Sequence, residues 1–95
     1  MSVTTEAIWN PQANNPYYRI SELILPASAS TGLRRFGFKT TFLPHTTGRL
    51  LIKTQVRSRH TEIIAGSPIE VERGTESEIV NATDRELIFT VLEFK

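Results

Sequence analysis

The stretch GSPIEVERGTESEIVN, residues 66–81, says more about the architecture than any other part of the chain. Gly66 opens a short segment rich in β-forming residues, and Gly74 separates this segment from a second one that ends at Asn81. Glycine and asparagine are typical of turns because both accept tight backbone conformations. The spacing therefore predicts two short strands, over residues 68–73 and 76–80, with a turn at each boundary.

The same kind of pattern extends over most of the chain. Short runs rich in Ile, Val, Thr and Phe, separated by Pro, Gly and Asn, predict five further strands, at 17–25, 36–43, 49–56, 59–65 and 86–94. No stretch shows sustained helical periodicity, and no internal repeat is present. Short strands at this spacing predict an all-β sandwich or barrel.

Composition limits the possible classes of function. A chain of 95 residues is one small domain, and a domain of this size is stabilised by oligomerisation. A formal net charge of +1 argues against a general nucleic-acid-binding protein. Cysteine is absent, which excludes disulfides and thiolate metal sites. No apolar run approaches the roughly 20 residues of a membrane span, so no membrane partner is predicted.

The N-terminal residues differ from the rest. Residues 1–16 are polar and rich in Asn, Pro and Thr, which predicts an extended arm ahead of a domain over residues 17–95. Ile8 and Trp9 are the exceptions in this arm. Two interpretations remain open: these side chains bind a partner, or Trp9 covers the core as a local lid.

Residues 66–81 resemble the second cupin motif, G-x5-P-x-G-x2-H-x3-N. Gly66, Gly74 and Asn81 stand at the spacing of the motif, Glu72 replaces its proline and Ser77 replaces its histidine. In metal-dependent cupins this histidine points into the barrel and binds the ion, whereas a serine hydroxyl is a poor ligand for a transition metal. The resemblance implies an all-β cupin, a small β-barrel or jelly roll, without metal or another cofactor.

The first cupin motif, G-x5-H-x-H-x3–4-E-x6-G, also lacks its ligands. Its closing glycine corresponds to Gly48, which places Thr41 at the glutamate position. The two histidine positions fall on Arg35 and Gly37, or on Arg34 and Phe36. Because ligand positions point inward in this family, a barrel pocket lined by Arg35, Thr41 and Ser77 is expected.

Side chains alternate along a strand, so this register would turn three phenylalanines outward. An aromatic stripe of that kind suits a protein interface, although a register shifted by one residue would place the rings in the core. Residues 86–94 are apolar on both faces, so the outer face needs a cover, either the arm or a second copy of the chain. The predicted homodimer contacts are Phe36, Phe38, Phe42, Leu87, Phe89 and Val91.

Charge is segregated along the chain. Residues 34–60 contain basic side chains and no acid, and most acids follow residue 60. The two groups either pair across neighbouring strands, or the basic residues form a face for an acidic peptide or DNA phosphates. Partner binding is predicted for Ile8, Trp9, Arg57 and Arg59. The histidines have no second ligand at metal spacing and no Gly-x-Ser-x-Gly elbow occurs, so no enzyme activity is predicted.

The order of these features from Tyr17 to Lys95 resembles the C-terminal cupin domain of centromere protein C (the CENP-C/Mif2 family). The features are Tyr17-Tyr18 leading to Leu23–Pro26, Gly48–Leu51, Gly66–Asn81 and Glu86–Thr90. The resemblance implies a nuclear homodimerisation and recruitment module of the centromere and kinetochore, which links CENP-A nucleosomes to inner-kinetochore or CENP-A loading proteins. Dimerisation would act there by raising avidity.

Two other classes of function remain open. A small cupin of another family would bind a polar small molecule at the mouth of the barrel, or act as an enzyme there. A β-sandwich structural subunit would assemble into rings or shells.

Overall fold

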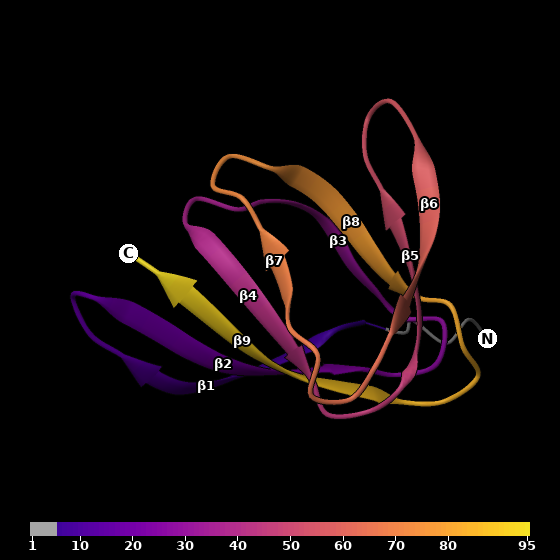
Figure 1. Ribbon diagram of the computed structural model, residues 1–95, viewed down its shortest axis with the longest axis horizontal. Coiled ribbons are helices and arrows are strands. Elements are labelled where there is room, and N and C mark those ends of the chain that lie inside the picture. Colours follow the sequence, from indigo (N-terminus) through magenta and orange to yellow (C-terminus); the bar gives the residue numbers. More distant parts are fainter. Residues whose placement is uncertain (1–5) are drawn as a thin grey trace.

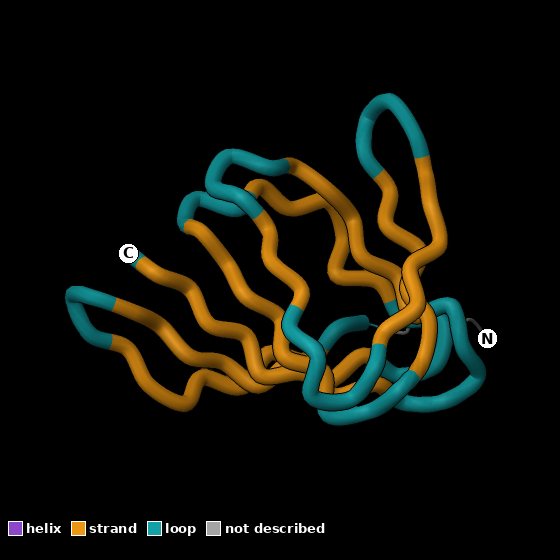
Figure 2. The backbone as a smooth tube through the Cα atoms, in the orientation of Figure 1, coloured by secondary structure: helices purple, strands orange, loops and turns teal. Residues whose placement is uncertain are grey.

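The computed structural model describes residues 6–95, which contain no helix and therefore no helix that could cross a membrane (Figure 2). The strands are β1 (Ile8–Asn14), β2 (Tyr18–Leu25), β3 (Ser30–Arg35), β4 (Lys39–Pro44), β5 (Gly48–Lys53), β6 (Ser58–Ile63), β7 (Ile69–Val71), β8 (Glu76–Asn81) and β9 (Leu87–Phe94). The prediction of an all-β protein is confirmed.

The strands form two antiparallel sheets that face each other as a jelly roll (Figure 1). The five-stranded sheet has the order β1-β2-β9-β4-β7, and the four-stranded sheet has the order β3-β8-β5-β6. Near β1 and β3 the sheets are tied together, since the Ala7 amide donates a hydrogen bond of 3.3 Å to the Ser30 carbonyl. On the other side, β7 and the β5–β6 hairpin flank the space between the sheets (Figure 1).

Two strands were not predicted, β1 and β3. β1 lies within the predicted arm and pairs with β2 at the edge of the larger sheet, where Pro11 is tolerated because an edge strand has unpaired amides. β3 begins in a segment predicted as a turn, and its pairing with β8 is interrupted between Ser30 and Leu33. Gly32 lies in this irregularity with φ of 70°, a conformation that favours glycine.

The core lies between the sheets and is built around three aromatic rings. Phe42 packs edge to face against Phe36 at a centroid distance of 5.8 Å and against Phe89 at 6.2 Å. Leucine, isoleucine and valine side chains from both sheets surround the rings: Leu23, Leu25, Leu50, Ile63, Ile79, Leu87 and Val91.

The predicted outer stripe of dimer contacts is wrong for five of its six residues. Phe36, Phe42, Leu87, Phe89 and Val91 are buried with exposed fractions between 1% and 7%, and Phe38 is half-buried. The alternative register, with the rings in the core, is therefore confirmed for Phe36 and Phe42. The error has a physical reason: β9 is apolar on both faces, and a shift of one residue exchanges the faces without disturbing the hydrophobic pattern.

The outer face of the larger sheet is also apolar, with half-buried Ile20, Ile24, Ile88 and Leu92. The expectation that the arm covers this face is wrong for residues 8–14, because β1 lengthens the sheet at its edge. Residues 1–5 of the predicted arm lie outside the described part of the chain.

Gly48 has a packing role that explains its place in the first motif. A Cβ atom at this position would lie 2.7 Å from Cδ2 of Leu87, a core side chain that is 1% exposed. We expect Gly48→Ala to cost about 1–3 kcal/mol of unfolding free energy, because the buried leucine has little room to move. Gly37→Ala is the matched control, since nothing lies within 4 Å of its added Cβ. Equal melting temperatures for the two variants would contradict the explanation.

Candidate ligand-binding site

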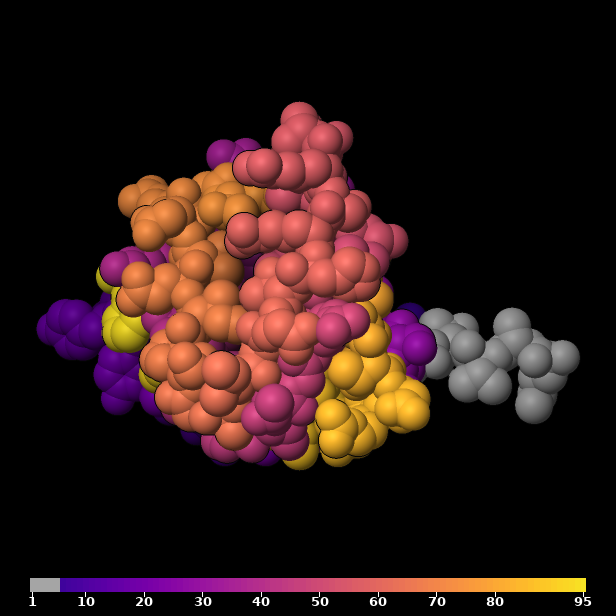
Figure 3. Space-filling view, turned by 45° about the vertical axis from the view of Figure 1, so that its right-hand side comes forward, coloured from indigo at the N-terminus to yellow at the C-terminus, as the bar shows by residue number. Residues whose placement is uncertain are grey.

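A cavity of about 350 Å³ lies between the sheets and opens between β7 and the β5–β6 hairpin. Figure 3 shows this face of the molecule, where the hairpin and the segments around β7 and β8 lie side by side. The floor of this mouth cavity is apolar and consists of Phe42, Leu50, Ile52, Ile69, Val71 and Ile79. Its rim is polar and consists of Thr54, Arg57, Arg59, Glu70, Glu72 and Thr75, and the buried Ser77 lines the interior. The size is at the small end of the roughly 300–1000 Å³ usual for small-molecule sites.

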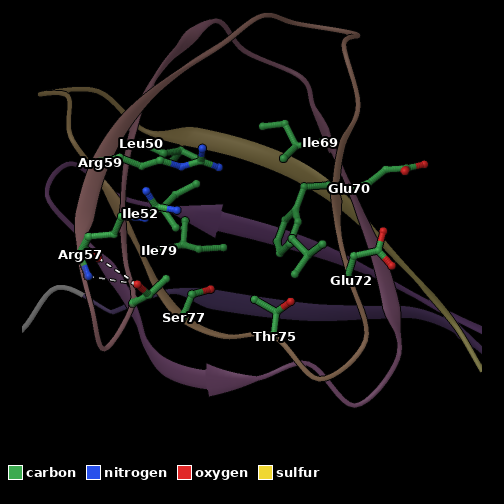
Figure 4. Close-up of a pocket in the computed structure, with 13 residues that line it drawn as sticks. Leu50, Ile52, Arg57, Arg59, Ile69, Glu70, Glu72, Thr75, Ser77 and Ile79 are labelled. Carbon is green, nitrogen blue, oxygen red and sulfur yellow. Dashed lines mark hydrogen bonds between the residues drawn. The ribbon is translucent and has the colours of Figure 1, made fainter.

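Two arginines of the β5–β6 hairpin stand on one side of the mouth. Arg59 is paired with Ile52 across the hairpin and so shares the inner face of the sheet. Arg57 lies in the loop, where its amide donates a 3.3 Å hydrogen bond to Thr54 Oγ1 and its carbonyl accepts one of 2.8 Å from the Thr54 amide. Figure 4 shows both arginine side chains extending toward the cavity. Among the residues that the structure describes, neither guanidinium group forms an ion pair.

The carboxylates of the rim lie on the opposite side. Glu70 is paired with Thr41 on the outer face of the sheet, and its carboxylate is 4.0 Å from Lys39 Nζ. Figure 4 shows the side chains of Glu70 and Glu72 directed away from the two arginines. The positive charge of the mouth is therefore concentrated on the hairpin side, and the negative charge on the side of β7.

The interior does not supply the ligands of a metal-dependent cupin. Ser77 is 3% exposed and faces inward, as predicted. The inward positions of the first motif are Arg34, which is paired with Ser77, and the buried Phe36 and Thr40. Hydroxyl, guanidinium and phenyl groups do not form a site for a transition metal. Over residues 6–95, no group of three histidine or acidic side chains is arranged to hold a metal ion.

Of the three predicted pocket residues, the structure brings only Ser77 into the cavity. Thr41 lies between the inward-facing Thr40 and Phe42 and therefore points outward. Arg35 is paired with Glu76. Because Ser77 points inward, its neighbour Glu76 points outward, and Arg35 points outward with Glu76. Both placements were wrong for the same reason as the phenylalanine stripe, a register shifted by one residue.

The predicted partner-binding residues separate into two groups. Trp9 packs against the core, and Arg34 lies 4.2 Å from the centre of its ring, which favours the interpretation as a lid. Ile8 is 47% exposed on the outer face, so its predicted role stays untested. Arg57 and Arg59 lie at the mouth cavity, which assigns them to an internal site rather than to an outer basic face.

Charge pairing across neighbouring strands accounts for part of the segregated charge. Arg49 pairs with Glu62 at 2.7 Å on the exposed face of the hairpin. Arg19 forms two hydrogen bonds with Glu93, of 3.0 and 2.6 Å, and this carboxylate raises the pKa of Arg19. Pairing of this kind does not extend to the arginines of the mouth.

The apolar floor was not predicted as part of a site. Ile69 and Val71 alternate with Glu70 and Glu72, so the period of two in residues 68–73 already separates an apolar face from a charged one. This alternation was the signal in the sequence that identified the apolar face of the strand. It did not reveal a cavity, because the same pattern is typical of a strand packed on a solid core.

Two facing antiparallel sheets around an open-mouthed cavity are the architecture of a cupin, and the comparison with solved structures identifies the class. A cupin domain from Bordetella pertussis has the same fold with a TM-score of 0.93 and 27% sequence identity, over 100% of this chain and 99% of that one. No family model matches the sequence. The beta-alanine degradation protein BauB of Pseudomonas aeruginosa is 30% identical over 95 residues, which are the whole of both chains. The chain belongs to the family of this protein, within the cupins.

The assignment to centromere protein C is wrong. The cupin domain of Cnp3 from Schizosaccharomyces pombe matches with a TM-score of 0.78 but only 12% identity, over 94% of this chain and 64% of that one, and so shares the fold alone. The relatives that match over the full length are bacterial. The predicted recruitment of kinetochore proteins and the nuclear, centromeric location are overturned by the same finding. Homodimerisation as such stays a prediction. Gly48 and Asn81 were among the residues that suggested the centromeric assignment. Gly48 allows close packing against Leu87, and Asn81 forms hydrogen bonds within the fold.

Proposed function

We propose that this cupin binds a small polar molecule in the mouth cavity. The observation that carries the proposal is an apolar cavity whose rim holds two arginines that form no ion pair with any residue from 6 to 95. Small-molecule sites typically combine an apolar wall with a few polar groups that set the orientation of the ligand. The printed name of the Pseudomonas relative, a beta-alanine degradation protein, supports a role in the metabolism of small organic molecules.

We further propose binding without catalysis. Proton transfer requires an acid or base within hydrogen-bond reach of the substrate. His45 bonds to Thr90 Oγ1 at 2.6 Å away from the cavity, and His60 is exposed on the outer face of the hairpin. Glu70 points outward and Glu72 lies at the exposed rim. An apolar cavity with two arginines on one side of its mouth is suited to holding a ligand.

The test is a titration of ¹⁵N-labelled protein with small metabolites: amino acids that include β-alanine, organic acids, sugars and amines. We expect one class to shift the amide signals of Ile52, Thr75, Ser77 and Ile79, which line the cavity. We expect Thr75→Phe to fill the mouth and abolish these shifts, because the backbone hydrogen bonds of Thr75 do not depend on its side chain.

Thr47→Phe is the control, because Thr47 is exposed and does not line the cavity; it removes a 3.2 Å hydrogen bond from the Ala65 amide to Thr47 Oγ1, so its melting temperature is measured alongside binding. The proposal is wrong if no compound shifts the cavity signals, or if Thr75→Phe leaves the shifts unchanged. Conversion of the bound compound to a product during incubation would overturn the second part of the proposal, binding without catalysis.

A further inference from the structure

We infer that the ligand of the mouth cavity is a small carboxylate with a short apolar body, and that Arg57 and Arg59 bind its carboxylate group. This inference rests on the proposed function, because it names the class of molecule that the cavity binds. Three features of the cavity favour such a ligand: the arginines on one side of the rim, the apolar floor and the structure of the hairpin loop.

The charge on the hairpin side of the rim favours an anion, because Glu70 and Glu72 lie on the opposite side and are directed away from the arginines. Arg19 and Arg49 each form an ion pair with a glutamate, whereas Arg57 and Arg59 form none within residues 6–95. Both side chains extend toward the same cavity from one hairpin, so an anion bound there would be attracted by two positive charges (Figure 4). The planar guanidinium group presents paired donors that match the two oxygens of a carboxylate.

The floor of the cavity determines what accompanies the anionic group. Six apolar side chains line the floor, and polar lining residues other than the charged ones are limited to Thr54, Thr75 and Ser77. A ligand with many hydroxyl groups would leave several of them without hydrogen-bond partners, which is unfavourable in a buried site. A short hydrocarbon body instead gains free energy by covering apolar surface. The combination favours an amphipathic acid over inorganic phosphate or a sugar.

The loop holds the arginines ready for binding. Thr54 Oγ1 accepts a hydrogen bond from the Arg57 amide, and the hydroxyl donates to the Arg57 carbonyl at 3.1 Å. Arg59 lies two residues further along in β6, where it is paired with Ile52. Both arginines are therefore attached to backbone that is already ordered, which reduces the entropic cost of binding an anion.

The experiment compares butyrate with butyramide, 1-butanol and inorganic phosphate, by titration of the labelled protein at fixed ionic strength. These probes separate the negative charge from the apolar body. We expect butyrate to shift the cavity signals with an affinity at least about tenfold higher than butyramide or butanol, and phosphate to bind more weakly than butyrate. Arg57→Gln and Arg59→Gln are each expected to weaken butyrate binding by roughly tenfold to a hundredfold, since each removes a charged hydrogen bond.

Lys53→Gln is the matched control, because Lys53 is exposed and lies next to the cavity residue Ile52 on the opposite face of the same hairpin. It removes one positive charge and is expected to leave butyrate affinity within about twofold, in line with the weak effect of exposed charges. Arg57→Lys is expected to lie between the wild type and Arg57→Gln, because it keeps the charge and loses the paired donors.

The outcomes separate this inference from the proposed function. If butyramide or a sugar binds the cavity as tightly as butyrate, the carboxylate inference is wrong and the proposed function stands. If phosphate binds as tightly as butyrate, or if Lys53→Gln weakens butyrate as much as Arg57→Gln does, recognition of an amphipathic carboxylate by these two arginines is excluded. If no probe or metabolite shifts the cavity signals, both proposals fail.

Discussion

Phe89→Glu is expected to leave the chain unfolded at room temperature. Phe89 is 1% exposed and packs edge to face against Phe42 in the centre of the core. Loss of a buried phenylalanine costs about 3–5 kcal/mol, and burial of an unpaired carboxylate adds several more. A domain of this kind has about 5–15 kcal/mol of stability in total, so the substitution removes most or all of it.

Circular dichroism and the dispersion of the NMR spectrum measure this effect. Ile88→Glu is the matched control, because Ile88 is the next residue of β9 and lies half-buried on the outer face of the sheet. We expect the control to stay folded. A soluble, folded Phe89→Glu protein would show that this residue faces outward, as the predicted stripe of dimer contacts required, and would contradict the observed register.

Asn81→Ala is expected to lower the free energy of unfolding by about 3–5 kcal/mol, since several buried polar groups would lose their partner. Asn81 is 1% exposed, and its Nδ2 donates to three carbonyl oxygens: Leu25 at 2.9 Å, Pro26 at 3.1 Å and Arg85 at 2.6 Å. Its Oδ1 accepts from the amide of Thr83 at 2.9 Å. One amide group thus joins the end of β2 to the loop that leads into β9.

Thermal unfolding measures this prediction, and the expected decrease in melting temperature is roughly 12–40 °C for a domain of this size. Asn10→Ala provides a control of the same chemistry, because the side chain of Asn10 donates only one hydrogen bond, to Glu22 at 3.2 Å, near the sheet edge. If both variants melt within a few degrees of the wild type, Asn81 does not hold the two segments together.

The role of Asn81 explains why the cupin motif identified the fold correctly but did not identify the family. The spacing of Gly66, Gly74 and Asn81 predicted a cupin, and the fold is a cupin. The same spacing was used to support a particular family, and that assignment was wrong. Because Asn81 satisfies backbone groups between strands, its presence is a requirement of the fold. A residue with such a role carries no information about the ligand or the partner.

The candidate site was predicted only in part. Ser77 was expected to face inward, and it does. Arg57 and Arg59 were selected because they form an exposed basic cluster near a turn, but the sequence contains no sign that this turn bends over a cavity. Their position depends on the pairing of β5 with β6 and on the place of β7 across the opening, contacts that join residues far apart in the chain.

By itself, the sequence determined the all-β class, because turn residues and the period of two are local properties that a single segment displays. The cupin fold followed from the resemblance of residues 66–81 to a cupin motif, in which Ser77 replaces the histidine of metal-dependent cupins. Only the tertiary structure decided which face of β4 and β9 is inside, and therefore which residues form the core and which line the cavity. Both faces of β9 are hydrophobic, so the local pattern is satisfied by either register. The choice is made when the second sheet packs against one face, and this packing also brings Arg57 and Arg59 to the mouth of an apolar cavity.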